Sequence, residues 1–331
     1  MAFVEMKSIN KEAMVWIDGP GDGAWNMALD QAMVQHASAE DCIILRLYQW
    51  VRPTLSLGYF QSYEEGRSIP ALKDIDCVRR VTGGGAIIHD HEITYSIAVP
   101  KSFEDSIDSD SSKAGEPSGV GSGKIQKPSL RHSESLYRII HARTTQWLRG
   151  LGFDASIYES LADASEINAS QIDASEAGLD TQLAASCSRP DCKAFLCFDR
   201  RSDVDIVLGQ RQENQKVLGS AQRRTSGVLL QHGSLLLAPS AYAPHLTGVD
   251  SQMLHEAEVS LEAQYLRNLN AKKWGWTIDF CRVLQDSIDS LWSCDWRFDE
   301  PNQVVLSLAQ KIKEKKFSSD NWTIARQKSD E

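Results

Sequence analysis

The 331-residue sequence lacks three features that would each point to a different class of protein. No stretch approaches the roughly 18–20 uninterrupted apolar residues of a membrane span. Basic residues are too few for a general nucleic-acid binder, because 35 Lys and Arg stand against 45 Asp and Glu and give a formal net charge of −10. Seven cysteines, an odd number spread over a long chain, do not make a disulfide scaffold. We therefore expect reduced thiols and neither a membrane nor a nucleic acid as partner.

The N-terminal residues also lack the apolar region of a secretory signal peptide. Glu5, Lys7 and Lys11 fall where that region would lie. We therefore expect a soluble, cytoplasmic protein, and its 42% hydrophobic residues are enough to build a substantial core.

Neither a phosphate-binding loop nor a metal site is predicted. The glycines of 119–124 are similar to a Walker motif, but Ser118 stands where that motif has its first glycine and Ile125 replaces its Ser or Thr. The cysteines of 187–197 are spaced more widely than the paired ligands of structural zinc, and no second pair appears. The His-Asp-His run of 89–91 is more typical of a polar or hydrogen-bonding feature on a strand than of a metal site.

Hydrophobic periodicity predicts a fold that mixes helices and strands. A helix is expected over 25–37, where apolar residues recur at i, i+3, i+4, i+7 and i+8, and another over 133–149. Residues 93–99 alternate large apolar residues with Thr, Ser and Ala, as a half-buried strand does. Further strands are predicted over 43–50 and 54–60, and a hairpin with a long polar loop is predicted from 203–208 and 216–222. Residues 227–237 are expected to form a strand pair or a bent strand that is kinked at Gly233. Strands dominate the middle of the chain, which favours an α+β fold with a mixed, largely antiparallel sheet and flanking helices.

Two tracts with few large apolar residues interrupt this pattern. Residues 102–127 are rich in Ser, Gly and Asp, and residues 159–190 contain the tripeptide Asp-Ala-Ser twice. Such segments cannot bury enough surface to offset the entropy of ordering the chain, so both are predicted to be inserted flexible tracts. We divide the chain into one domain over 12–250 and a small helical C-terminal segment over 251–331.

A run of three glycines follows two arginines in the middle of the chain. Gly83, Gly84 and Gly85 come directly after Arg79-Arg80-Val81-Thr82. Glycine lets a backbone approach a ligand closely and adopt positive φ, and guanidinium groups are fixed donors for a phosphate or a carboxylate. The spacing alone is equally compatible with a ligand-binding loop and with a plain connection between strands.

Five longer motifs occur in a fixed order along the chain. They are WNMALDQA (25–32), LRLYQW-x2-PTLSLGYFQ (45–61), VRRVTGGGAIIHD-x-EITYS (78–96), CFDRRSDVDIVL (197–208) and KVLGSAQRRTSGVLLQHGSLLL (216–237). In this order they resemble the lipoate–protein ligase and octanoyltransferase superfamily, which shares its catalytic fold with the biotin–protein ligases. KFSSDNWTIAR (316–326) is similar to the C-terminal element of that family. The resemblance implies that 12–250 is a catalytic domain of the biotin/lipoate–protein ligase fold.

The resemblance leaves two main activities open. The ligases of the superfamily activate lipoate with ATP as an acyl-adenylate, whereas the LipM-type octanoyltransferases take octanoate from acyl carrier protein and hold it on a cysteine. EITYS after the glycine loop, Cys197-Phe198-Asp199 and GSAQRR are closest to the transferases. The third glycine, Gly85, is closer to the ligases. We predict an octanoyltransferase without a cofactor and keep the ligase, with ATP and Mg, as the alternative.

The resemblance also implies roles for individual residues. Cys197 corresponds to the nucleophile, and Lys216 to the lysine whose ammonium favours a thiolate and stabilises an oxyanion. The residues implied for substrate binding are Arg80, Gly83, Gly84, Gly85, His89 and His232. The expected partners are acyl carrier protein and a lipoyl-domain protein such as the glycine-cleavage H protein or an E2 subunit. Transfer between two carrier domains is also compatible with these residues, and so is a catalytically silent protein that only binds acyl groups or carrier proteins.

Overall fold

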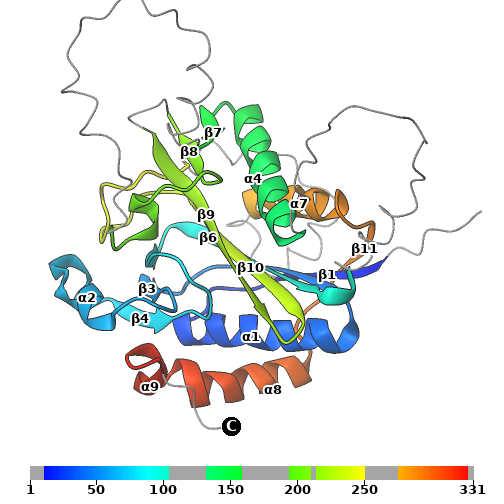
Figure 1. The fold of residues 1–331 in the computed structure, drawn as a ribbon, viewed down its shortest axis with the longest axis horizontal. Coiled ribbons are helices and arrows are strands. Elements are labelled where there is room, and N and C mark those ends of the chain that lie inside the picture. The colour runs from blue at the N-terminus through cyan, green and yellow to red at the C-terminus, as the bar shows by residue number, and fades with distance from the viewer. Residues whose placement is uncertain (1–10, 104–131, 159–193, 210–213, 250–274, 327–331) are drawn as a thin grey trace, which may run out of the picture.

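The computed structural model describes residues 11–103, 132–158, 194–209, 214–249 and 275–326 (Figure 1). The strands in these ranges are β1 (Lys11–Ile17), β2 (Ile43–Tyr48), β3 (Thr54–Leu57), β4 (Asp76–Arg79), β5 (Ile87–His89), β6 (Glu92–Pro100), β7 (Ala155–Ile157), β8 (Ile206–Leu208), β9 (Gln215–Thr225), β10 (Val228–Leu236) and β11 (Cys294–Phe298). The helices are α1 (Gly23–Glu40), α2 (Tyr63–Ser68), α4 (His132–Gly150), α7 (Gly275–Asp289), α8 (Gln303–Ile312) and α9 (Asp320–Thr323), with the short helical turns η1 (Pro70–Leu72), η3 (Cys197–Asp199) and η7 (Lys313–Phe317). Of the two tracts predicted to be flexible, 104–127 and all of 159–190 lie outside the described residues.

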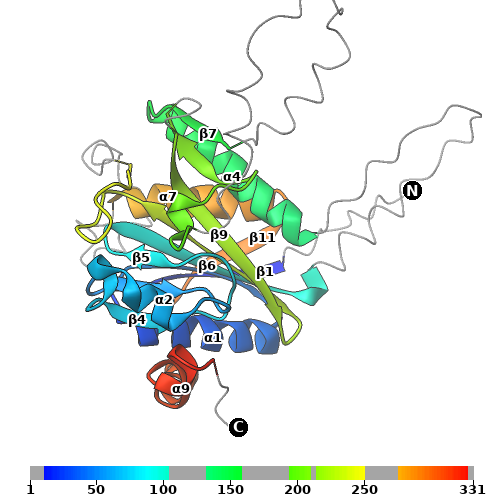
Figure 2. The same ribbon diagram turned by 60° about the vertical axis from the view of Figure 1, so that its left-hand side comes forward.

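Eight of the described strands form one sheet in the order β11-β1-β2-β6-β10-β9-β8-β7. Strand β1 is parallel to both of its neighbours, and every other neighbouring pair in this sheet is antiparallel. A second sheet of the described chain, β4-β3-β5, lies beside one end of α1 together with α2 (Figure 2). The predicted fold class, a mixed and largely antiparallel sheet with flanking helices, is confirmed.

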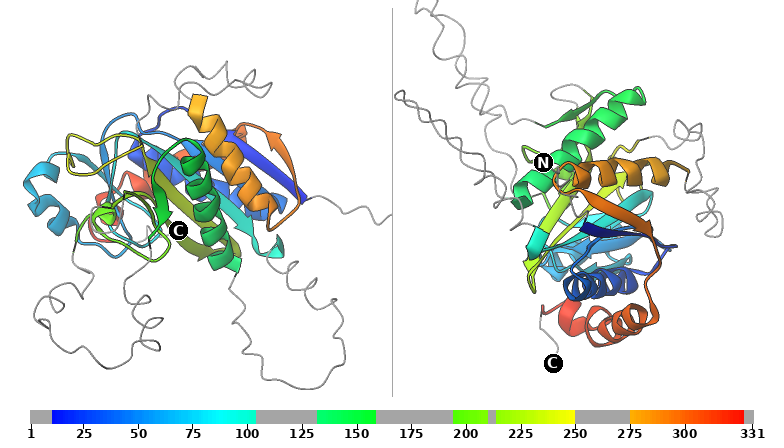
Figure 3. Two further views of the ribbon diagram at one scale, coloured as in Figure 1. Left: turned by 90° about the horizontal axis from the view of Figure 1, so that it is seen from above. Right: turned by 90° about the vertical axis from the view of Figure 1, so that its right-hand side faces the viewer.

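Helices cover both faces of the large sheet (Figures 1 and 3). α4 and α7 pack on one face, and α1 packs on the other with α8 behind it. Successive residues of a strand point to opposite faces. Val15 and Leu45 therefore join the core under α4 and α7, while Met14 and Ile44 join the core against α1.

The prediction of a half-buried strand over 93–99 is wrong, because every residue of β6 is buried. Ile93, Tyr95 and Ile97 point into the core under α4 and α7. The opposite face carries small residues that α1 covers, and the hydroxyl of Ser96 donates to Asp30 of α1 at 2.7 Å. The small residues at alternate positions of β6 therefore lie on a face that a helix covers, and not on a face exposed to solvent.

Helix α1 extends the predicted helix over 25–37 by a few residues at each end. Its N-cap is Asp22, whose carboxylate accepts from the Trp25 N–H at 2.8 Å and so satisfies a backbone donor of the first turn. Asp41 ends the helix in the left-handed region at φ 48°. The helix therefore begins and ends at aspartates that its apolar periodicity does not include.

The hairpin predicted from 203–208 and 216–222 is confirmed, since β8 and β9 are antiparallel neighbours. The segment 227–237 forms a single strand, β10, and Gly233 is required there by packing. A Cβ at Gly233 would lie 2.5 Å from Ser220 Oγ and 2.6 Å from a ring carbon of Tyr95. The glycine lets these two side chains meet directly over the strand.

The C-terminal residues are joined to the large sheet and to α1. The segment predicted to be helical over 251–331 is helical in α7, α8 and α9, and it also contributes β11 to the sheet edge beside β1. Trp322 of α9 donates to the Arg79 carbonyl at 2.7 Å, and Arg79 Nε donates to the Thr323 carbonyl at 2.9 Å. The half-exposed sequence CDWRF of β11 gives only a weak strand signal.

Two neighbouring valines of α8 provide a matched test of this packing. Val305 is 2% exposed in the core against α1, whereas Val304 is 76% exposed. We expect Val305→Ala to lower the free energy of unfolding by about 2 kcal/mol, because it removes two buried methyl groups and leaves a cavity. Val304→Ala should change it by less than about 0.5 kcal/mol. Urea unfolding measures both, and equal effects would contradict the packing of α8.

Candidate active site

Cys197 and Lys216, the two residues predicted to be catalytic, lie side by side. Cys197 opens the turn η3, and Lys216 is near the start of β9. Lys216 Nζ lies 3.5 Å from Cys197 Sγ and 3.4 Å from the Cys197 carbonyl oxygen. The ammonium group is thus placed where it can stabilise negative charge on the sulfur.

Asp205, which the sequence analysis missed, holds Lys216 in place. Its Oδ2 lies 2.8 Å from Lys216 Nζ, and the two side chains are 2% and 4% exposed. Asp205 Oδ2 also accepts from the Ser202 N–H at 2.8 Å. The pair forms because Asp205 directly precedes β8, in which Val207 is paired with Lys216. The sequence signal that could have identified Asp205 is an aspartate directly before the apolar residues of β8.

Glycines make room for both catalytic candidates. A Cβ at Gly85 would lie 2.8 Å from Cys197 Cα, and a Cβ at Gly219 would lie 2.4 Å from Lys216 Cε. Cys197 N donates to the Ala86 carbonyl at 2.7 Å, so the glycine loop and the cysteine segment are bonded along their backbones. Because Gly85 and Gly219 have no side chains, the segments around them can pack closely against Cys197 and Lys216.

Arg80 organises the glycine loop from inside. Its Nη2 donates to the carbonyls of Gly83 at 2.8 Å and Gly85 at 2.6 Å, and Nη1 donates to the Ser56 carbonyl at 2.9 Å. Gly84 lies between these carbonyls at φ +91°, a conformation that favours glycine. Burial lowers the pKa of Arg80 to about 10, so the guanidinium stays charged at neutral pH.

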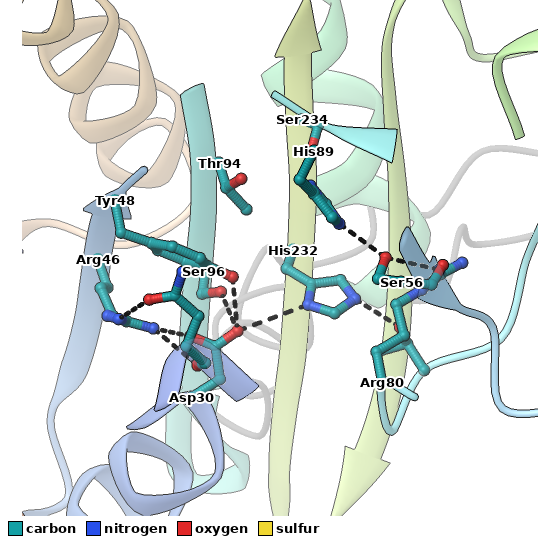
Figure 4. Close-up of polar contacts among 12 residues, drawn as sticks. Asp30, Arg46, Tyr48, Ser56, Arg80, His89, Thr94, Ser96, His232 and Ser234 are labelled. Carbon is teal, nitrogen blue, oxygen red and sulfur yellow. Dashed lines mark hydrogen bonds and ion pairs between the residues drawn. The ribbon is translucent and has the colours of Figure 1, made fainter. Parts of the chain in front are cut away.

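His232 of β10 connects the glycine loop to a buried carboxylate on α1. Its Nε2 lies 2.5 Å from Thr82 Oγ1, and its Nδ1 lies 3.6 Å from Asp30 Oδ2 (Figure 4). Burial lowers the pKa of His232, and the nearby Asp30 offsets this only in part. The imidazole is therefore neutral at neutral pH and orients the loop through Thr82.

Asp30 is held as a carboxylate by several donors (Figure 4). Arg46 Nη1 donates to it at 2.6 Å, the Tyr48 hydroxyl at 3.0 Å and the Ser96 hydroxyl at 2.7 Å. Burial raises the pKa of Asp30, but Arg46 and His232 lower it by more, so the net shift is downward. A fixed anion behind His232 therefore keeps the orientation of that ring.

His89 is held in a second chain of hydrogen bonds. Its Nε2 lies 2.7 Å from Ser56 Oγ, which also accepts from Arg80 (Figure 4). Its Nδ1 lies 2.5 Å from Glu92 Oε1. The ring stacks on Trp50 with centroids 3.8 Å apart. His89 is therefore oriented from three sides and links Glu92 to Arg80.

A small pocket, with a cavity volume of about 40 Å³, brings most of the predicted site residues together. Cys197, Arg80, Gly84, His89 and His232 all line it, and its wall is mainly apolar. The other two loop glycines do not line it. Cys197 therefore lies at a mainly apolar wall, which suits the apolar chain of an acyl group.

The other described cysteines lack a comparable environment. Burial raises the pKa of Cys42 and Cys77 to about 11 and that of Cys294 to about 12. Those thiols stay protonated at neutral pH and are poor nucleophiles. Cys281 is 1% exposed in the core under α4 and α7. Among the cysteines that the structure describes, Cys197 is therefore the candidate nucleophile.

His141 of α4 supports the site from the far side of β9, and the sequence analysis missed it. Its Nδ1 donates to the Val204 carbonyl, and its Nε2 lies 2.8 Å from Ser220 Oγ. Ser220, which lines the pocket, also contacts the Tyr95 hydroxyl at 2.6 Å. Burial lowers the pKa of His141 to about 3, so this imidazole is neutral and accepts from Ser220.

Within the described ranges, no three His, Cys, Asp or Glu side chains gather as a metal site would require. In the same ranges, no helix combines the length and the apolar character needed to cross a membrane.

The chain matches a known family. Residues 22–118 match the model of the lipoyl protein ligase A/B catalytic domain. Curated relatives more than 30% identical to the chain are matched over two thirds of their own length. The chain belongs to this family, which confirms the resemblance drawn from the motifs.

Curated relatives that the chain matches carry the name Octanoyltransferase LipM. The one from Kyrpidia tusciae is 36% identical over 222 residues, which are 66% of this chain and 64% of that protein. The one from Bacillus subtilis is 32% identical over 233 residues, which are 69% of this chain and 67% of that protein. The chain therefore spans about two thirds of the length of the curated relatives that it matches.

Solved structures of lipoate–protein ligases share the fold. A lipoate-protein ligase A bound with ATP is 19% identical at a TM-score of 0.54, with 95% of this chain and 98% of that chain covered. A bi-partite lipoate protein ligase from Thermoplasma acidophilum, described with its E2 lipoyl domain, is 17% identical at a TM-score of 0.55, with 97% and 98% covered. At these identities the likeness establishes the fold alone.

Two glycines of one loop test the packing against the nucleophile. Gly85→Ala should lower the free energy of unfolding by roughly 1–3 kcal/mol, because its Cβ has no space beside Cys197. Gly83→Ala should change it by less than about 0.5 kcal/mol, since nothing lies within 4 Å of a Cβ there. Thermal and urea unfolding give both values. A Gly85→Ala variant as stable as Gly83→Ala would refute the close approach.

His141 makes stability depend on pH. The unfolded chain binds a proton at the ordinary histidine pKa near 6.5, whereas the folded protein resists it down to about 3. The stability contributed by the neutral ring is therefore complete above pH 6.5 and is lost as the pH falls below it. His141→Gln, which can still pair with Val204 and Ser220, should remove up to about 1.4 kcal/mol per pH unit of this loss between pH 6 and 4. Urea unfolding at several pH values measures the slope, and identical slopes would contradict the burial of a neutral His141.

Proposed function

We propose that the protein is an octanoyltransferase that moves an octanoyl group from acyl carrier protein to a lysine of a lipoyl-domain protein through a thioester on Cys197. The observation that carries the proposal is the 3.5 Å contact between Lys216 Nζ and Cys197 Sγ at the wall of a mainly apolar pocket. The names of the curated relatives support it.

In the first half-reaction Cys197 takes the acyl group. The Sγ thiolate attacks the thioester carbonyl carbon of the donor, a carbon–sulfur bond forms and the bond to the donor sulfur breaks. The donor leaves as a thiol with the proton that Cys197 has lost. Because one thioester replaces another, the step needs no nucleotide. Once the sulfur is acylated, the Lys216 N–H that pointed at it can donate to the carbonyl oxygen and stabilise the oxyanion.

In the second half-reaction the acyl group moves to the acceptor. The neutral amine of the acceptor lysine attacks the acyl-Cys197 carbonyl, the carbon–nitrogen bond forms and the carbon–sulfur bond breaks. The proton released by the amine goes to the departing sulfur. An amide replaces a thioester, so this half-reaction is downhill.

Gly85 bears on the alternative of an ATP-dependent ligase. A third glycine in the loop is closer to the ligases, but here its position is explained by the approach of Cys197. A ligase that works through an adenylate has no need of a cysteine at this place. The glycine therefore supports the transferase as much as the ligase.

The proposal also covers the cofactor requirement, the acceptor and the cellular location. It requires no cofactor, because the donor thioester already carries the activated acyl group. The acceptor class is supported by the family's bi-partite ligase, which is described with an E2 lipoyl domain. A cytoplasmic location fits a nucleophile that must stay a reduced thiol.

The test follows the intact mass of enzyme and acceptor after incubation with octanoyl-acyl carrier protein and a lipoyl domain, without ATP. We expect one octanoyl group on the enzyme and one on the lipoyl domain. Cys197→Ser should abolish the enzyme adduct and slow transfer by on the order of 1,000-fold or more. Lys216→Ala should slow transfer by roughly 100-fold, because an oxyanion donor is lost.

Cys77→Ser is the matched control, since that thiol lies outside the pocket, and it should keep both adducts. Acylation of the lipoyl domain only after ATP and free lipoate or octanoate are added, with no effect of Cys197→Ser, would establish the ligase instead.

A further inference from the structure

The lysine beside the nucleophile brings no net charge to the site. Lys216 Nζ lies 2.8 Å from Asp205 Oδ2 and 3.5 Å from Cys197 Sγ, and both members of the ion pair are buried. The carboxylate next to the ammonium offsets part of the attraction that the ammonium exerts on a negative sulfur. The lysine can direct an N–H at the sulfur, but the pair as a unit is neutral.

Arg80 is a buried cation without an anionic partner among the described residues. Four of its N–H directions go to neutral oxygens, namely the Ser56 carbonyl and hydroxyl and the carbonyls of Gly83 and Gly85. Its Nε is buried and makes no hydrogen bond within the described structure. The side chain is 2% exposed, so solvent does not screen its charge.

Arg80 binds a residue that packs directly on the nucleophile. It binds the Gly85 carbonyl at 2.6 Å, and Gly85 packs directly on Cys197. Both Arg80 and Cys197 line the same pocket. Burial lowers the pKa of Arg80, and Cys197 is the first group that raises it again. The guanidinium charge and Cys197 therefore lie within electrostatic reach of each other.

The other charged groups around the pocket have side-chain partners, are neutral or are exposed to solvent. Asp30 shares Arg46 with Asp18. Glu92 contacts His89, and Asp199 contacts His245. Burial keeps two further imidazoles and three phenols uncharged at neutral pH, those of His141, His232, Tyr48, Tyr95 and Tyr137. Arg200 and Arg201, on the turn of the nucleophile, are part-exposed, and their donors bind carbonyl oxygens.

We propose that Arg80 is the positioning residue whose unbalanced positive charge favours the thiolate of Cys197, while the Lys216–Asp205 pair only orients the sulfur and the acyl oxygen. This inference rests on Cys197 being the nucleophile of the proposed function. The net positive charge of the site then comes from the arginine in front of the glycine loop. The neutral groups around Arg80 leave that charge uncompensated.

The test is the pH profile of alkylation of Cys197 by iodoacetamide, read by peptide mass spectrometry on the full chain without any acyl donor. Arg80→Met should move the midpoint of the profile up by about one pH unit or more, which lowers the thiolate fraction near neutral pH about tenfold. Arg80→Lys keeps the charge and should restore most of the shift. A purely structural role of Arg80 would not be rescued in this readout by charge alone.

Two further proteins complete the test. The double variant Asp205→Asn, Lys216→Met removes both charges of the pair and should leave the midpoint within about 0.3 pH units of the parent. Arg79→Met removes a neighbouring buried guanidinium that binds the carbonyls of Gly58 and Gln61, and it should lower stability without moving the midpoint.

A double variant whose midpoint rises by a full unit would overturn the proposal, because Lys216 would then be the counter-charge. This outcome is decisive even where Arg80→Met does not fold. A folded Arg80→Met protein with an unchanged midpoint would overturn it as well. If octanoyl transfer fails while the alkylation profiles follow these expectations, the proposed function is refuted and the charge assignment stands.

Discussion

The site depends on a short backbone bridge between the end of the glycine loop and the cysteine segment. Ala86 N donates to the Phe195 carbonyl at 3.0 Å, and Cys197 N donates to the Ala86 carbonyl at 2.7 Å. These two bonds join segments about a hundred residues apart and fix the nucleophile against the loop. Because Gly85 has no side chain, the bridge can close. Arg80 then binds the Gly85 carbonyl on one side, and Lys216 contacts the sulfur on the other.

Around this bridge the protein buries several charged groups, each with a defined partner set. Removing one member of a buried ion pair lowers the free energy of unfolding by about 3–5 kcal/mol, because the other charge is left unpaired. These groups are therefore held firmly in place. Lys216 with Asp205 and Arg46 with Asp30 are such pairs, and each links two separate elements of the fold. The charges thus fix the relative positions of α1, β2, β8 and β9 around an otherwise apolar pocket. Arg79 and Arg80 differ from these pairs, because their hydrogen bonds go to neutral oxygens.

Sequence patterns predicted the elements whose signals are local. The periodicity of 25–37 predicted α1, and the fold class followed from the mixture of helices and strands. Strand β11 was missed because its edge position leaves CDWRF half-exposed, and β6 was misread because α1 covers its polar face. In the site, motif resemblance identified Cys197 and Lys216. Asp205 and His141 escaped it, because their roles arise only when β8, β9 and α4 pack together.

The pairing of β1 with β11 has a consequence for how the chain folds during synthesis. A ribosome releases the residues of β1 early, but the strand that covers its outer edge comes from the opposite end of the described chain. Trp322 likewise reaches back to the carbonyl of Arg79, next to the glycine loop. Contacts so distant in sequence form late and slowly. The nascent protein therefore carries an open sheet edge, and the Arg79 carbonyl lacks its Trp322 donor, until translation has passed α9.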